Sequence, residues 1–150
     1  MTSRAVMAAF GVATLAAAAG GCGADQAAEA RAPDAASEVR RVHHAWLERL
    51  ARGDADACDL LTQRARFAFV NEDTGACFLA VERFAASTTP EERRAFPNVR
   101  VRRVTVKANR ARIEDRDLIT PSELYRLSPI NGRPMTFRRI EGRWRIDRIG

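Results

Sequence analysis

The chain has 150 residues and a formal net charge of +6, from 25 basic and 19 acidic residues. This length is close to the commonest size of a single domain, so it allows one sizeable hydrophobic core and excludes two full domains. Nearly all of the positive charge is arginine, with Lys107 the sole lysine. Together with the abundant alanine, this pattern indicates the codon bias of a high-GC coding sequence rather than selection for binding a polyanion.

The first 21 residues have the features of an export signal. Arg4 is the only charged residue before Cys22, and an apolar, alanine-rich run from Ala5 to Ala19 follows it. This run is shorter than the roughly 20 residues that a membrane-spanning helix needs, and it has the length of a secretory signal core. Residues 1–21 are therefore predicted to be a signal peptide.

The end of this signal, "LAAAAGGCGA", resembles a bacterial lipobox. In that motif the cysteine carries a lipid group on its sulfur atom and becomes the first residue of the mature chain. The resemblance implies that Cys22 carries a lipid, such as palmitate, that anchors the protein at the outer face of the cell membrane. Ala19 departs from the usual pattern, which has a large aliphatic residue at that position. Free secretion and retention by an uncleaved helix are the alternatives.

Residues 22–36 are predicted to be the acylated cysteine and a flexible tether. The sequence "GADQAAEARAPDAA" has little large apolar content and no helical stripe, so it should not pack against a domain. A flexible chain of its 14 residues spans about 20 Å root-mean-square. Residues 37–150 are then a single domain lying close above the membrane.

Helices are expected to come first in this domain. Apolar residues at three- and four-residue spacing predict an amphipathic helix, with Gly53 ending it and Asp54 capping a second one. A third helix is expected over residues 76–86, and "TPEE" at residues 89–92 predicts a short capped turn. The buried stripe of the first helix is predicted to contain Val39, Val42, His43, Trp46, Leu47 and Leu50.

From Val99 the apolar period changes to two, which indicates strands. Val99 and Val101 alternate in one phase, and Val104 and Val106 alternate in the other. A β-bulge is therefore predicted at residues 102–103, where the phase changes. "KANR" predicts a turn, with a return strand beginning at residues 111–113. "TFRRIEGRWRID" predicts a hairpin about Glu141 and Gly142. Its register pairs Phe137 with Ile146, Arg139 with Trp144, and Arg138 with Arg145. Helices followed by an antiparallel sheet predict an α+β fold.

Four stretches together resemble the nuclear transport factor two-like superfamily, especially its small exported bacterial lipoproteins. They are "HHAWLERLARGDADACDLLT", "ACFLAV", "VRRVTVKANRARI" and "RRIEGRWRID". The resemblance implies N-terminal helices packed on the concave face of a strongly curved antiparallel sheet, which forms a cone that can hold a pocket. Residues 117–132 fit this pattern least and are expected to be a partly irregular excursion near the mouth of the cone.

The two cysteines of the domain are predicted to form a disulfide. Cys58 and Cys77 are 19 positions apart and lie on the core-facing sides of the second and third expected helices. Acylation of Cys22 would leave them as an even pair in an oxidising compartment, where disulfides persist. Two separate buried thiols are the alternative.

His43 is the candidate acid, base or ligand, because it lies in the middle of a stripe that would face the cone. A core histidine with one satisfied hydrogen bond is the simpler interpretation. A metal site is not expected, since His43 and His44 are adjacent on a helix and point about 100° apart. Catalytic superfamily members surround the cone with a carboxylate or histidine base and an aromatic hydroxyl. The single tyrosine, Tyr125, lies in the least regular stretch, so no catalytic residue is carried over.

The expected function is non-enzymatic: a lipid-anchored envelope protein that binds a small apolar ligand or another envelope protein. The candidate pocket-lining residues are His43, Trp46, Phe137 and Trp144, although such aromatics are more often core. Arg138, Arg143 and Arg145 share the outer face of the last hairpin, either solvated or facing a bound anion. No cofactor is expected, and export disfavours nucleic-acid binding. The alternative is an enzyme of the polyketide cyclase or isomerase kind, with His43 as its acid or base.

Overall fold

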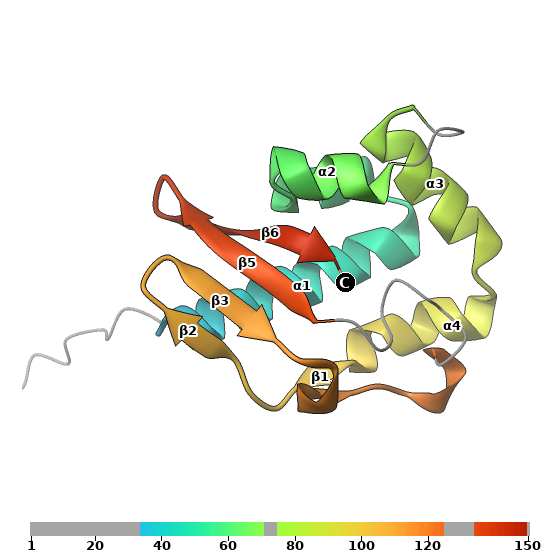
Figure 1. The fold of residues 1–150 in the computed structure, drawn as a ribbon. Coiled ribbons are helices and arrows are strands. Elements are labelled where there is room, and N and C mark those ends of the chain that lie inside the picture. Colours follow the sequence, from blue (N-terminus) through green and yellow to red (C-terminus); the bar gives the residue numbers. More distant parts are fainter. Residues whose placement is uncertain (1–33, 71–74, 125–133, 150) are drawn as a thin grey trace, which may run out of the picture. The chain divides into compact units, whose positions relative to one another are not determined.

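The chain places its helices before its strands, which confirms the α+β class predicted from the sequence (Figure 1). The computed structural model describes residues 34–70, 75–124 and 134–149. The predicted signal peptide, the candidate anchor Cys22 and the single tyrosine Tyr125 lie outside these ranges. Within them, no helix has the length and apolar character that crossing a membrane requires.

Helix α1 (Ala35–Arg52) is the amphipathic helix that the apolar spacing predicts. It begins inside the segment assigned to the tether because Asp34 caps it. The Asp34 carboxylate accepts a hydrogen bond of 2.6 Å from the backbone N–H of Ser37. This bond lowers the pKa of Asp34, since it stabilises the charged carboxylate. Gly53 ends the helix with a φ of 70°, a left-handed conformation that glycine adopts readily.

The second helix expected after Asp54 is divided in two. Asp54 caps a short 3₁₀ helix, η1 (Ala55–Leu60), and the α-helix α2 (Gln63–Phe69) begins only after a break. The break occurs because the chain pairs with the last strand of the protein at this point. The backbone N–H of Thr62 donates to the carbonyl of Ile146 at 2.8 Å, and the Thr62 side chain caps α2.

The third helix and the capped turn are present as predicted. Helix α3 (Cys77–Ser87) is followed by α4 (Pro90–Ala95), which opens with a full capping box. The backbone N–H of Thr89 donates to the Glu92 carboxylate at 2.7 Å, and the N–H of Glu92 donates to the Thr89 hydroxyl at 3.2 Å. These reciprocal bonds fix where α4 begins. A 3₁₀ turn, η2 (Phe96–Asn98), leads into the strands.

Among the described residues the strands form two antiparallel sheets. One sheet has four strands in the order β2-β3-β5-β6, and the other pairs β1 with β4. The expected excursion after β3 supplies β4, between two 3₁₀ turns. The bounds are β1 (Arg100–Val101), β2 (Thr105–Lys107), β3 (Arg110–Ile113), η3 (Asp115–Asp117), β4 (Leu118–Ile119), η4 (Ser122–Leu124), β5 (Met135–Ile140) and β6 (Arg143–Ile149).

The valines before and after residues 102–103 all pack against the core, as their alternation predicts. The β-bulge expected at residues 102–103 is wrong, because the chain leaves one sheet there and enters the other. Strand β1 pairs with β4, whereas β2 pairs with β3. Val101 of β1 and Val106 of β2 each turn inward from their own sheet, and the change of phase falls in the link between the two strands.

The final hairpin has the predicted register. Glu141 and Gly142 form its turn with φ values of 50° and 78°, and this two-residue loop sets how β5 and β6 align. The register shifts beyond Phe137, which leaves Asp147 as an extra residue on β6. The observed pairs include Phe137 with Ile146, Arg138 with Arg145, and Arg139 with Trp144.

The main core lies between α1 and one face of the four-stranded sheet. Figure 1 shows α1 passing behind β3 and β5, and its buried side contains Trp46 and Leu47. The inward-facing sheet residues Ala111, Phe137 and Ile146 belong to the same core cluster. Alternation along each strand then turns the intervening residues toward the opposite face of the sheet.

Candidate functional site

His43 lies in the wall of a surface hollow of about 460 Å³. Helix α1 directs the side chain inward, because residue 43 falls on the same helical face as Val39 and Trp46. The side chain is only 1% exposed. The other residues of the wall come from α1, from Pro97 and Val99, and from β1, and three of them are arginines: Arg40, Arg41 and Arg100.

Burial changes the acid–base chemistry of His43. It lowers the pKa of His43 from 6.5 to about 4, because the protonated ring loses the water that would solvate its charge, and the nearby His44 lowers the pKa further. The ring is therefore neutral at pH 7. A neutral imidazole can bind a ligand or donate and accept hydrogen bonds. A base with this pKa is weak, however, and general bases work best with a pKa near the working pH.

The three aromatic candidates for a pocket lining are buried. Trp46, Phe137 and Trp144 are 0%, 1% and 4% exposed, and all three belong to the core cluster. The ring of Trp46 packs edge-on against Phe69 at 6.4 Å. Neither Trp46 Nε1 nor Trp144 Nε1 has a hydrogen-bond partner within the described ranges. Buried donors of this kind need an acceptor, which an ordered water or a bound ligand would supply.

His44, the next residue on α1, is exposed. Its Nδ1 atom is 3.7 Å from the carboxylate of Glu48, one turn later on the exposed side of α1. In the described part of the chain, no three His, Cys, Asp or Glu side chains gather closely enough to hold a metal ion. Both histidines line the same hollow, but His43 is buried whereas His44 is exposed.

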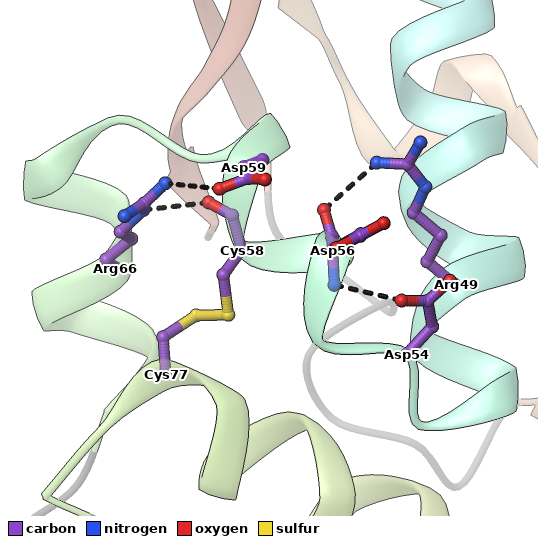
Figure 2. A network of polar contacts seen from close by, with 7 residues as sticks. All are labelled: Arg49, Asp54, Asp56, Cys58, Asp59, Arg66 and Cys77. Carbon is purple, nitrogen blue, oxygen red and sulfur yellow. Dashed lines mark hydrogen bonds and ion pairs between the residues drawn. A yellow bond between two sulfur atoms is a disulfide. The ribbon is translucent and has the colours of Figure 1, made fainter.

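Cys58 and Cys77 form a disulfide, with their Cα atoms 6.1 Å apart. The bond joins η1 to the first residue of α3 (Figure 2). The alternative of two separate thiols does not apply. The bond closes a loop that contains the whole of α2, so it ties three consecutive helical segments together.

Hydrogen bonds from two arginines support the same junction (Figure 2). Arg66 on α2 donates from Nε to the Cys58 carbonyl at 2.8 Å and from Nη2 to the Asp59 carboxylate at 3.1 Å. Arg49 on α1 donates to the carbonyl of Asp56 at 3.0 Å. These contacts hold η1 against both neighbouring helices, so the disulfide reinforces an arrangement that is also fixed by polar contacts.

Sequence reasoning found only part of a basic surface on the four-stranded sheet. It placed Arg138 opposite Arg145, which the structure confirms. It did not find that Lys107 and Arg110 continue the same row across β2 and β3. The turn "KANR" predicts one of the missing pairs, since it places Lys107 opposite Arg110. The pairing of β3 with β5, which places Arg110 opposite Arg138, was not predicted because these strands are not consecutive in the chain.

No protein-family model, curated protein or solved structure matches this chain. No relative therefore supplies roles for its residues. The positions and chemistry of its own side chains are what support a function.

Proposed function

We propose that the protein is an exported, lipid-anchored cell-envelope protein whose folded domain is a non-enzymatic binding module for a small ligand or another envelope protein. The observation that carries this proposal is the disulfide between Cys58 and Cys77. Disulfides persist in oxidising compartments and are rare in the cytosol. The bond also accounts for two of the three cysteines. It leaves Cys22, at the end of a signal-like segment, for acylation.

A binding role is supported by two unsatisfied donors in the core between α1 and the sheet. The proposed architecture is the cone of the nuclear transport factor two-like superfamily, and the packing of α1 on one face of an antiparallel sheet agrees with it. The indole N–H groups of Trp46 and Trp144 offer two buried donors. A mostly apolar ligand with an acceptor atom would satisfy them at little desolvation cost.

The low pKa of His43 weighs against the enzymatic alternative. Because the ring is neutral and weakly basic, it would accept a proton from substrate less readily than a histidine of ordinary pKa. Such a histidine suits ligand contact or core packing better than proton transfer. An enzyme of the cyclase or isomerase kind would lose its turnover in His43→Ala, whereas a binding module has no turnover to lose.

The lipid anchor predicts that radiolabelled palmitate enters the wild-type protein in a bacterial host and does not enter Cys22→Ala. We expect the wild type in the membrane fraction and the variant in the soluble, extracytoplasmic fraction, because one thioether-linked lipid group would be missing. The matched control is Cys58→Ala/Cys77→Ala, which should keep its label. Equal labelling of wild type and Cys22→Ala would contradict the anchor. Export of an unlabelled wild type would instead identify a secreted protein.

A further inference from the structure

A row of basic side chains crosses all four strands of the larger sheet. The register places Lys107 opposite Arg110, Arg110 opposite Arg138, and Arg138 opposite Arg145. Adjacent strands lie about 4.8 Å apart, so the row spans about 14 Å. A second row on the same face contains Thr105, Arg112, Thr136 and Arg148.

These rows lie on the face of the sheet that points away from the core. The row between them consists of Val106, Ala111, Phe137 and Ile146, all of which belong to the core or pack against it. Because side chains alternate along a strand, the basic rows project from the other side. The site is therefore separate from the hollow beside His43 and from the interior tryptophans.

The basic face is hollowed. A depression of about 520 Å³ lies over β2, β3, β5 and β6, and α2 contributes to its rim. Thr136 lies in its lining, and the hydroxyl of this residue has no hydrogen-bond partner within the described ranges. Ala111 and Phe137, which are buried and belong to the core cluster, contribute atoms to the lining between the two basic rows. The basic residues of the lining are Arg64, Lys107, Arg110, Arg112, Arg138 and Arg148.

The charge of the hollow is poorly balanced by protein groups. Within the described lining Asp147 is the one acidic residue, and its carboxylate accepts a hydrogen bond of 3.2 Å from the Thr62 hydroxyl. Arg112 pairs with Glu114.

The remaining basic residues of the two rows are less well balanced. Over the part of the chain that the structure describes, no ion pair involves Lys107, Arg110, Arg138 or Arg148. Like charges directly opposite one another destabilise a sheet, and here three such pairs are consecutive.

We propose that this hollow binds an anion that carries a phosphate group. Arginine is suited to this ligand, because its planar guanidinium group makes paired hydrogen bonds to phosphate oxygens. A bound anion reduces the repulsion between the basic side chains of the row. Its oxygens can accept hydrogen bonds from more than one of the arginines that line the hollow. The ligand is either a soluble oligophosphate or the phosphate of an anionic lipid headgroup. The site does not depend on export or acylation, so its failure leaves the proposed function untouched.

The test measures binding of two probes by the full chain, purified as the Cys22→Ala variant so that no lipid is attached, near physiological salt, with Arg138→Gln as the added substitution. The first probe is inorganic tripolyphosphate, followed by calorimetry. The second is vesicles of phosphatidylglycerol with phosphatidylcholine, followed by co-sedimentation, with pure phosphatidylcholine vesicles as the blank. We expect Arg138→Gln to weaken binding of the bound probe about tenfold, since it removes a charge-assisted contact.

The matched control is Arg94→Gln, which removes the same charge from α4. Arg94 is exposed and pairs with Glu91, so its loss should affect stability little, and its binding should stay within about twofold of wild type. Tripolyphosphate binding alone identifies a soluble ligand, and vesicle binding alone identifies a headgroup; binding of both assigns the phosphate group itself. Failure of the wild type to bind either probe, or equal loss in both variants, overturns the proposal.

Arg138→Glu separates loss of binding from loss of folding. Its carboxylate would lie between Arg110 and Arg145 in the register, so two repulsive pairs become attractive. We expect this variant to melt at or above the wild-type temperature and yet to bind neither probe. Retention of wild-type affinity in this folded variant would show that the row does not form the site.

Discussion

Removal of the disulfide between Cys58 and Cys77 is expected to lower the free energy of unfolding by about 3 kcal/mol. The bond joins residues 19 positions apart, and closing a loop of this size removes a corresponding conformational entropy from the unfolded chain. For a domain of this length, the loss corresponds to a fall of about 10 °C or more in melting temperature. Thermal and urea unfolding of Cys58→Ala/Cys77→Ala beside the wild type measures the effect.

Reductant supplies the internal control for this prediction. It should lower the melting temperature of the wild type toward that of the double variant and leave the double variant unchanged. Cys22→Ala, which lies outside the loop, should respond to reductant as the wild type does. A wild type whose melting temperature is the same with and without reductant would contradict a stabilising role for the bond.

Acidification from pH 7 to pH 4 is expected to destabilise the fold by about 3 kcal/mol through His43 alone. Burial lowers the pKa of this residue from 6.5 to about 4, and each pKa unit corresponds to about 1.4 kcal/mol. The folded state therefore holds a neutral ring in a pH range where the unfolded chain binds a proton. The stability is present above pH 6.5 and is lost as the pH falls toward 4.

Two variants isolate this contribution from the carboxylates that also titrate at acid pH. His43→Gln removes the buried imidazole, so its stability should fall less steeply than that of the wild type between pH 7 and pH 4. His44→Gln alters the exposed neighbour, which lies near Glu48, and should keep the steep wild-type dependence. Urea unfolding at several pH values measures all three. Parallel profiles for wild type and His43→Gln would show that His43 is not buried in its neutral form.

Local signals in the sequence were sufficient to predict several elements. Gly53 and Asp54 mark the end of α1 and the restart after it, because glycine adopts a left-handed conformation and aspartate accepts from free amides. The turn at Glu141 and Gly142 fixed the register of β5 with β6, since a two-residue loop leaves little freedom. The first turn of α4 was likewise read from four adjacent residues.

Features that depend on distant pairing could not be predicted in the same way. The second helix breaks because Thr62 bonds to Ile146, a residue far along the chain. The bulge predicted between the valine pairs is a change of sheet, because β1 finds its partner in β4. The basic hollow depends on β3 lying beside β5, which brings Arg110 opposite Arg138. Burial of His43 was predicted from helical spacing, and Arg40 and Arg41 are near it on α1, whereas Arg100 reaches the same hollow only through the fold.

The thiol state of the protein taken directly from its cells tests the central claim most directly. Alkylation before and after reduction, followed by mass spectrometry of the peptides, reports each cysteine separately. We predict that Cys58 and Cys77 resist alkylation until they are reduced, and that Cys22 is the acylated first residue of the mature chain. Recovery of the protein with residues 1–21 attached and all three thiols free would contradict the account.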